Sequence, residues 1–428
     1  MKRRIMVAVL AAVFALGIIP NLSNDHKVEA QTTEVLEGTL KKKKLKRNKI
    51  YLLRGGVFIT KKLVIQSGTQ IFGLPGSFLV IDRGARIDAE GTPDRPIVFS
   101  SAAPEGTKRR GDWGGLIFNG RAPINVPGGE AEGEGDTGAY GGGANPNAND
   151  SSGVMRYVRV EYGGFAISPD NELNCIAFQG VGAGTTVEFV QAAFGGDDGL
   201  EFFGGTVNAK NIVITGASDD SLDWTEGWTG RIQFLVIQQR ADEADNGFEC
   251  DNSAENHNLT PRSAPRIMNA TIIGDPDPDG SGSTRGMLLR VGTHGQFRNF
   301  IVMGFKNVGL EIRDQATFDG FQAGTLALRS FMFFNNRNNN PNIANGATRD
   351  AITASGVKIM DGVDPLLADP FDRVAPDFRP QAGSPALVAA NVEPPFANDS
   401  FFVAANYVGA FDANMDWTLG WTNWVFGN

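Results

Sequence analysis

The chain is poor in the residues that most often build small catalytic centres and cross-linked folds. Its 428 residues include only two cysteines and three histidines. Two cysteines cannot supply the disulfide framework of a small secreted domain, even in an oxidising compartment. His257 and His294 are too few and too scattered for a zinc site. No segment resembles a serine nucleophile elbow, a phosphate-binding loop or a dinucleotide-binding fingerprint.

Long apolar runs are also missing, apart from one near the N-terminus. Lys2, Arg3 and Arg4 precede an apolar stretch of about 16 residues, and a small-residue cleavage pattern follows at residues 28–30. These features are typical of a secretory signal peptide. We predict that residues 1–30 are removed, which leaves no transmembrane span and a secreted, cell-surface or periplasmic protein. A retained membrane anchor is the alternative, although the run is short for a span.

The formal charge of −9 conceals two regions of opposite sign. Residues 1–50 carry 11 Lys/Arg against 4 Asp/Glu, so the rest of the chain has a net charge of −16. An acidic body argues against a nucleic acid as the partner. We interpret residues 31–50 as a basic leader ahead of the first strand; the alternative is attachment to an anionic surface. Its basic residues are Lys41, Lys42, Lys43, Lys44, Lys46, Arg47 and Lys49.

Glycine and phenylalanine, in contrast, are abundant, with 54 and 29 residues. This composition suits many short strands joined by tight turns. An apolar–x–x–apolar–x–apolar pattern recurs along the chain, and successive copies start 22 to 35 residues apart. The shortest intervals indicate bare repeats, whereas the longer ones contain loops. The copies start at Met155, Val187, Ala209, Ile232, Ile267, Phe297 and Leu328.

A second series of short segments alternates with the first. Each is a triplet with apolar outer residues and a central residue that is usually acidic, as in a strand with one face in the core. Two short strands in each repeat of about 22 residues predict a parallel β-solenoid. The triplets are 176–178, 200–202, 222–224, 248–250, 287–289 and 310–312.

The repeats define the expected organisation of the chain. We predict a solenoid over residues 51–335, with loop insertions at about 101–152 and 252–284. An open solenoid end exposes unpaired strand edges. We therefore expect residues 336–428 to add final rungs and an irregular cap that closes this end. The aromatic residues of that cap would be Trp417, Trp421 and Trp424.

Several segments resemble known β-helix proteins. Residues 57–100 are similar to the opening rungs of pectin-lyase-like right-handed β-helix proteins. The GDWGG motif at 111–115, DDGLEFFGG at 197–205 and DDSLDW at 219–224 resemble a family of secreted bacterial β-helix proteins of unassigned activity. The resemblance implies an all-β, right-handed parallel β-helix and export. It leaves the activity open, because this fold hosts lyases, hydrolases, adhesins and binding proteins.

The strongest candidate site is a ladder of acidic residues. Stacked rungs would place the carboxylates of three columns about 4.8 Å apart. Such carboxylates repel one another unless they are protonated, turned outward or neutralised by a cation, and Ca²⁺ is the candidate ion. For the first column, Asp197, Asp219 and Asp245, the alternative is hydrogen bonding to corner backbone. The candidate metal ligands are Asp197, Asp198, Asp219, Asp220, Asp223 and Asp245, with Glu201 and Glu249 as ligand-binding residues.

A polysaccharide-cleaving enzyme would use the same ladder. Acid polysaccharide lyases of this fold pair calcium-binding aspartates with a basic residue that abstracts a proton, and Arg285 continues the Asp198–Asp220–Asn246 column. The resemblance thus nominates Asp198, Asp220, Asp223 and Arg285 as catalytic candidates. Glycoside hydrolases of the fold carry a Gly-His-Gly element, which residues 293–295 do not match. Inverting hydrolases need an acid and a base about 6.5–9.5 Å apart, which residues two rungs apart can supply.

Aromatic residues and cysteines complete the predictions. Phe202 and Trp224 fall on apolar columns and are expected in the core, whereas Trp228 lies in a turn and is a candidate for stacking on a sugar. Cys175 and Cys250 lie in different columns, three rungs and roughly 14 Å apart, so we predict two free thiols.

These observations favour an exported, non-catalytic surface or extracellular protein. It would present an acidic face to a polysaccharide or a cell-envelope component, with Ca²⁺ as a candidate cofactor. The alternative is a polysaccharide lyase or glycoside hydrolase that uses that face.

Overall fold

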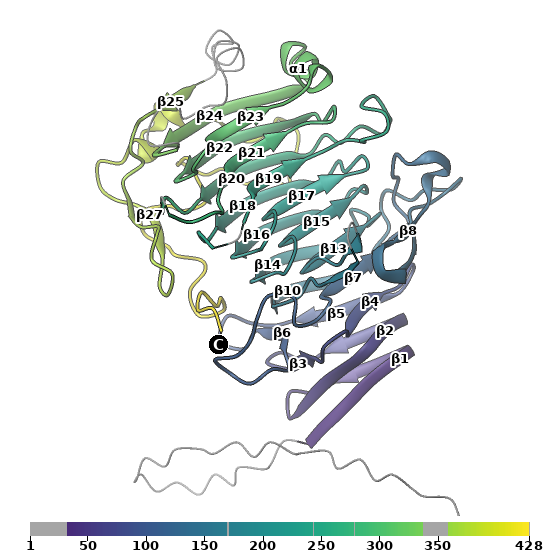
Figure 1. The fold of residues 1–428 in the computed structure, drawn as a ribbon. Coiled ribbons are helices and arrows are strands. Elements are labelled where there is room, and N and C mark those ends of the chain that lie inside the picture. Colours follow the sequence, from purple (N-terminus) through teal and green to yellow (C-terminus); the bar gives the residue numbers. More distant parts are fainter. Residues whose placement is uncertain (1–31, 169–170, 243, 278, 337–357, 428) are drawn as a thin grey trace, which may run out of the picture. The chain divides into compact units, whose positions relative to one another are not determined.

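The computed structural model describes residues 32–427, except 169–170, 243, 278 and 337–357. One 21-stranded, mostly parallel sheet winds into a right-handed β-helix, as predicted (Figure 1). The predicted signal peptide, residues 1–30, lies outside the described residues. Among the residues described, no helix is long and apolar enough to cross a membrane.

Seven long strands and seven short strands alternate along most of the helix. The long strands are β10 (Gly153–Glu161), β14 (Thr186–Ala193), β16 (Asn208–Thr215), β18 (Arg231–Gln238), β20 (Arg266–Ile273), β22 (Gly295–Met303) and β24 (Leu326–Phe334). The short strands are β7 (Leu116–Asn119), β13 (Ile176–Gln179), β15 (Leu200–Phe203), β17 (Leu222–Thr225), β19 (Asn246–Cys250), β21 (Arg285–Leu289) and β23 (Val308–Ile312).

The first rungs are built differently, because β1 (Thr32–Leu45) and β2 (Lys49–Ile65) each run along a whole turn of the helix. The next strands continue the three segments of β2 in parallel pairs. These strands are β3 (Gln70–Gly73), β4 (Phe78–Ile81) and β5 (Arg86–Glu90), and β6 (Ile97–Ser101) then pairs with β3. The remaining elements are β8 (Ala131–Gly133), β9 (Gly138–Tyr140), β11 (Ala166–Ser168), β12 (Asn171–Glu172), α1 (Gln315–Gln322), β25 (Ile359–Asp361), β26 (Leu367–Asp369) and β27 (Asp377–Pro380).

The pairing of strands confirms both predicted ladders. In the long strands, Met155 pairs with Val187, and the register continues through all seven predicted starts to Leu328. In the short strands, Ile176 pairs with Leu200, and the register continues to Leu310. Each rung therefore places its side chains above those of the rung before it.

The apolar–x–x–apolar pattern reflects a bend within each long strand. The third residue of each copy of the pattern has a left-handed backbone conformation, with φ between 49° and 63°. These seven residues are Tyr157, Phe189, Asn211, Phe234, Asn269, Asn299 and Ser330. The bend turns side chains on both sides of it toward the core. The long strands thus contribute two faces and the short strands a third, where the sequence indicated two strands in each rung.

Two predicted boundaries differ from the structure. Residues 32–45 of the expected basic leader form β1, in which Leu36 and Leu45 are buried against β2, so this segment is the first rung. The predicted insertions contain β7 and β20, which are integral strands of the helix. Lysine-rich outer positions concealed the alternation of β1, and long flanking loops concealed β7. β20 is the strand of the ladder copy predicted at Ile267.

The predicted aromatic cap is wrong in its position. Residues 363–427, which we call the C-terminal strap, run back along the side of the helix and end near β6 (Figure 1). Gly427 accepts a hydrogen bond from the backbone N–H of Gly106 at 2.6 Å. Apolar side chains on the outside of the long strands, such as Val213 and Val236, pack in one cluster with Trp421 and Trp424. The tryptophans cover this side because it is apolar.

Side-chain amides of several rungs hold the strap. Gln191 donates to the carbonyl oxygen of Asn423 and accepts from its N–H, both at 2.7 Å. Gln233 makes the same pair of bonds to Val403, at 2.7 and 2.9 Å. Asn299 binds the backbone of Glu393 in the same way. The strap is thus bound as an extended peptide along the helix.

Aromatic rings stack inside the helix from rung to rung. Phe202 and Trp224 are fully buried, as predicted. Trp228 is also fully buried, so the prediction that it stacks on a sugar is wrong. Its ring lies 4.0 Å from that of Phe202 at an interplanar angle of 8°, and its Nε1 donates to the carbonyl of Val207. The turn folds inward because this large apolar ring gains more from the core than from water.

Both cysteines are free, as predicted, and both are buried. Burial raises the pKa of Cys175 to about 12 and that of Cys250 well above its usual value. A thiolate is the reactive form of cysteine. We expect a thiol reagent to label neither residue in the folded protein and both after unfolding without reductant. Labelling of the native protein, or no free thiols after unfolding, would contradict this arrangement.

Candidate functional site

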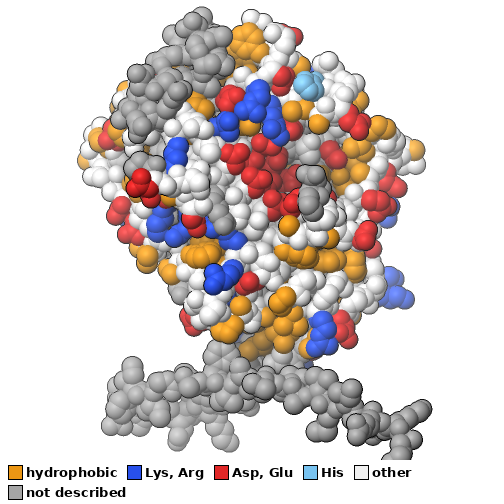
Figure 2. Space-filling view, in the orientation of Figure 1, with side chains coloured by type: hydrophobic (Ala, Val, Ile, Leu, Met, Phe, Trp, Pro, Cys, Tyr) orange, Lys and Arg blue, Asp and Glu red, His pale blue; other side chains and the backbone are white. Residues whose placement is uncertain are grey.

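The acidic residues gather on the outer surface of the short strands and on the turns before them (Figure 2). Alternation along β15, β17 and β19 points apolar neighbours inward and one carboxylate outward from each strand. A basic area adjoins the acidic one in the same view. We call the acidic face the set Asp197, Asp198, Glu201, Asp219, Asp220, Asp223, Asp245 and Glu249.

The predicted columns are present. Glu201 pairs with Asp223, which pairs with Glu249 on the next strand. The middle column forms a chain of hydrogen bonds, in which each side-chain Oδ1 accepts the backbone N–H of the residue one rung further on. The distances are 3.2 Å from Asp198 to Asn174, 3.0 Å from Asp220 to Asp198 and 2.6 Å from Asn246 to Asp220. Asp198 and Asp220 therefore join rungs as well as carrying charge.

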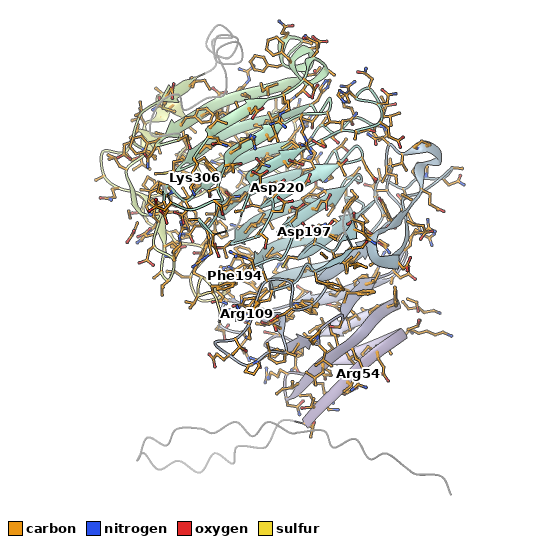
Figure 3. All side chains as sticks on the ribbon, viewed as in Figure 1. Arg54, Arg109, Phe194, Asp197, Asp220 and Lys306 are labelled. Atoms are coloured by element: carbon orange, nitrogen blue, oxygen red, sulfur yellow. The ribbon has the colours of Figure 1, made fainter. Side chains whose placement is uncertain are left out.

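Hydrogen bonding to the corner backbone was the alternative that we gave for the first column, Asp197, Asp219 and Asp245. The residues of this column lie closer to the surface than those of the middle column. Asp245 accepts a hydrogen bond from the Thr284 hydroxyl, and its N–H donates to the carbonyl of Asp219 at 2.9 Å. Asp219 is exposed, whereas Asp198 and Asp220 are only 6% and 4% exposed. The outer column is therefore more accessible to solvent or a ligand than the middle one. Asp197 and Asp220 lie on consecutive turns, before β15 and β17 (Figure 3).

The inner carboxyl groups of the acidic face are shifted toward their protonated forms. Burial is the largest cause, followed by neighbouring carboxylates, and together they raise the pKa of Asp198, Glu201, Asp220 and Asp223 well above its usual value. The same causes raise the pKa of Asp197 to about 7. Without a cation, the face therefore cannot hold its full charge at neutral pH.

The spacing of these oxygens suits a cation. Four groups of three carboxylates each offer oxygens within 4.8 Å of one another. Two groups share Asp223, with Asp198 and Glu201 on one side and Asp220 and Glu249 on the other. Asp223 Oδ1 is buried without a hydrogen-bond partner among the described residues. An unpaired buried oxygen is costly, so it requires a proton or a cation. These clusters can hold a metal ion.

Arginines border the acidic face at its C-terminal side. Arg285 pairs with Asn246 in the strand register, which confirms its predicted place in the column. Its Nε donates to Glu311 at 2.8 Å, and its guanidinium lies 3.6 Å from Asp245. Arg290 bonds both Glu249 and Asp251. Both guanidinium groups are therefore held by carboxylates.

Loop residues that the repeat could not reveal extend the site. Burial and nearby carboxylates raise the pKa of Glu134 to about 7, and burial raises that of Glu226 to about 7. Tyr140 donates to Glu226 Oε2 at 2.9 Å, and Glu172 of β12 adds charge near Asp197. Glu134, in the 3-10 turn of residues 134–136, and Tyr140 belong to a glycine-rich loop. Such loops follow no period, so no sequence signal linked them to the ladder.

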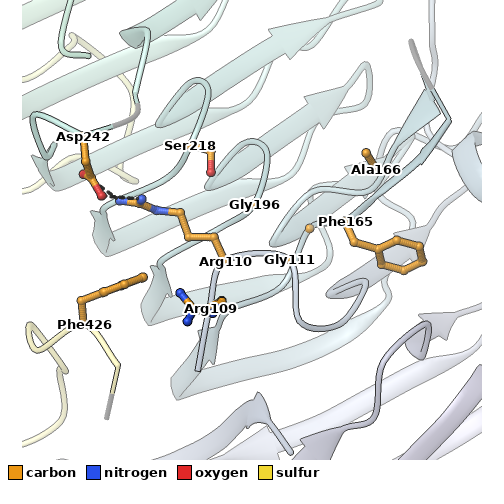
Figure 4. A pocket seen from close by; sticks show the side chains of 10 residues that line it. Arg109, Arg110, Gly111, Phe165, Ala166, Gly196, Ser218, Asp242 and Phe426 are labelled. Carbon is orange, nitrogen blue, oxygen red and sulfur yellow. Dashed lines mark hydrogen bonds and ion pairs between the residues drawn. The ribbon is translucent and has the colours of Figure 1, made fainter. Parts of the chain in front are cut away.

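A pocket of about 700 Å³, whose lining residues are drawn in Figure 4, lies next to the turns that carry the outer column of the acidic face. Gly196 and Ser218, which line it, immediately precede Asp197 and Asp219. Arg110 crosses the pocket and donates to Asp242 at 2.8 Å. The Arg109 guanidinium makes no hydrogen bond or ion pair within the residues that the structure describes. The pocket thus offers a free positive charge next to a cluster of negative ones.

Together, the winding of the sheet and the carboxylates on its short strands define a parallel β-helix with a site suited to cations. The family model described as "Pectate-lyase like beta helix domain" matches residues 38–362. The chain belongs to this family. Searches of curated protein sequences and of solved structures found no match.

The raised pKa values make stability depend on pH. Below about pH 3 these carboxyls are protonated in both the folded and the unfolded state. As the pH rises toward 7, the unfolded chain loses protons that the folded state retains. In metal-free buffer, the free energy of unfolding should therefore fall over this range, by up to about 1.4 kcal/mol per pH unit for each such group.

Chemical unfolding at a series of pH values measures this slope. The Asp198→Asn/Asp220→Asn variant should have a shallower slope than the wild type, and Glu105→Gln, an exposed control, should not. A wild-type stability that stays level or rises between pH 4 and 7 would show that the acidic face is not strained by its charge.

Proposed function

We propose that this chain is an exported, non-catalytic β-helix protein that binds an anionic glycan through Ca²⁺ held on its acidic face. The observation that carries the proposal is the unpartnered, buried Asp223 Oδ1 between two groups of carboxylates. Ca²⁺ accepts six to eight oxygen ligands in flexible geometry. Carboxylates of adjacent rungs can supply some of these ligands and leave others to a bound sugar.

The surroundings of the acidic face favour a negatively charged ligand. Arg109 lies in the pocket on one side, and Arg285, Arg290 and Arg313 lie beyond Glu249 on the other. A ligand carrying carboxylate or sulfate groups would contact Ca²⁺ in the middle and guanidinium groups at its ends. Membership of a pectate-lyase-like family is consistent with a polysaccharide ligand.

The arginine contacts favour binding over elimination. A lyase needs a basic group that can lose and regain a proton at the sugar. Arg285 is paired with Glu311 and Asp245, and Arg290 with Glu249 and Asp251. These carboxylates raise the pKa of Arg290 above its usual value, against the effect of burial. A guanidinium held in this way is poorly suited to abstract a proton.

Glycoside hydrolysis is the second candidate function, and one observation favours it. Glu134 and Glu226, at the edge of the acidic face, have a pKa of about 7. A general acid must carry its proton at neutral pH, as such a carboxyl does. Export rests on residues 1–30 alone, and the N-terminal sequence of protein recovered from the culture medium tests it.

Calorimetry of residues 31–428 with CaCl₂ tests the proposed cation site. We expect saturable binding by the wild type and a loss of binding of about tenfold or more in the Asp198→Asn/Asp220→Asn variant, since both charges are removed while the Oδ1 acceptors remain. Asp88→Asn, a substitution on β5 away from the acidic face, should bind Ca²⁺ as the wild type does.

A panel of acidic and neutral polysaccharides then tests the ligand. Acidic chains should bind in Ca²⁺ and dissociate in a chelator, and they should remain uncleaved after long incubation. If neither the wild type nor the Asp198→Asn/Asp220→Asn variant gives a heat of binding with CaCl₂, the cation site is refuted. Cleaved products would instead establish an enzyme, and loss of cleavage in Glu134→Gln or Glu226→Gln would identify the hydrolase.

A further inference from the structure

A second pocket, of about 460 Å³, lies between the long strands and the C-terminal strap. Its floor consists of residues at the bends of consecutive rungs, including Tyr157 of β10, Phe189 of β14 and Phe234 of β18. Strap residues Asp412, Asp416 and Trp417 form the opposite wall. The acidic face belongs to the short strands, so this pocket is a separate site.

The aromatic floor occupies positions that disfavour aromatic residues. Tyr157, Phe189 and Phe234 have φ values of 49°, 53° and 63°. Asparagine tolerates this left-handed conformation, whereas bulky side chains rarely adopt it. The bend between Phe189 and Phe234 has Asn211, which also lines the pocket. Later bends have Asn269 and Asn299, whose amides hold the strap backbone. Backbone preference therefore does not explain the rings at the other three bends of the floor.

Contacts between rings make the floor and one wall rigid. The rings of Tyr157 and Phe189 stack 4.4 Å apart at 13°, and Trp421 packs edge-on against both. Trp417 stacks on Phe411 at 5.2 Å. The floor residues remain half-buried, so part of each side chain faces the pocket.

Two carboxylates face this aromatic surface without a matching cation. Asp412 Oδ1 accepts the backbone N–H groups of Asn414 and Met415 at 2.6 and 2.7 Å. Asp416 Oδ1 accepts from the N–H and hydroxyl of Thr418. Neither Oδ2 atom has a hydrogen bond or ion pair within the described residues.

The nearby cation is already engaged. Asp377 is the main cause that raises the pKa of Arg379, and Asp412 and Asp416 are close enough to add to this effect. Asp377 accepts two hydrogen bonds from the Arg379 guanidinium, at 2.9 and 2.6 Å. The pocket therefore combines ring faces with an excess of negative charge. Ring faces attract cations, most strongly where water is partly excluded.

We propose that this pocket binds a ligand that carries an alkylammonium group. The ammonium would lie over the rings of Phe234 and Trp417, and the free oxygens of Asp412 and Asp416 would balance its charge. Two sources have this chemistry: the protonated amine of an amino sugar and a quaternary ammonium headgroup. An anionic glycan would be repelled here, so the site does not depend on the function proposed for the acidic face.

Calorimetric titration of residues 31–428 with tetramethylammonium chloride, glucosamine hydrochloride and glucose tests the proposal. At least one cation should bind saturably, and glucose should not. Binding of tetramethylammonium alone indicates a quaternary headgroup, and stronger binding of glucosamine indicates an amino sugar. Equal binding of glucosamine and glucose would overturn the proposal, as would binding of neither cation.

Variants separate the pocket from general effects on folding. Phe234→Asn should weaken cation binding by about tenfold without lowering the melting temperature, because asparagine suits the left-handed backbone. Phe234→Tyr retains a ring and should bind. Asp412→Asn/Asp416→Asn keeps the Oδ1 acceptors and should also lose binding.

Matched controls keep the result independent of the acidic face. Asp364→Asn alters an exposed strap carboxylate that caps the N–H of Leu366 in the same way as Asp412, outside the pocket. It should bind cations normally, and so should Asp198→Asn/Asp220→Asn. Undiminished binding in both folded pocket variants, Phe234→Asn and Asp412→Asn/Asp416→Asn, would refute the site.

Discussion

The vertical register of the rungs is the constraint on which the rest of the structure depends. Parallel strands stack about 4.8 Å apart, so a residue type that recurs once in each rung meets its own kind above and below. For Phe178 and Phe202 this repetition is favourable, because their rings stack 5.3 Å apart in the core. For Asp198 and Asp220 it brings buried like charges together. The same geometry that stabilises the interior therefore creates a surface that needs protons or a cation.

The outer surfaces respond to this repetition in different ways. The long strands repeat apolar side chains outward, and the C-terminal strap covers them. Amides such as Gln191 and Gln233, one from each of several rungs, bind the strap through its backbone. The short strands instead place carboxylates on their outer surface, and loops such as residues 134–140 border this surface on one side. One repeat thus supports a covered face and a face suited to ligands.

Periodicity determined how much could be predicted. Both ladders were correct, including the place of Arg285 after a long insertion, because apolar alternation and small corner residues mark each rung. Features that do not repeat from rung to rung were missed. The C-terminal strap has no periodic pattern, and Glu134 and Glu226 lie near the acidic face but in turns outside the repeated strands. Trp228 was misjudged because a turn residue was assumed to face water, whereas its ring stacks on Phe202. In β1, lysines conceal the alternation that buries Leu36 and Leu45.

A cation bound on the acidic face would offset the repulsion between its carboxylates. Anomalous X-ray scattering from crystals grown with calcium shows whether a cation binds there. We expect an anomalous peak about 2.3–2.6 Å from Asp223 Oδ1, with ligands from Asp198 and Glu201 or from Asp220 and Glu249. A well-ordered acidic face with no anomalous peak under these conditions would contradict it.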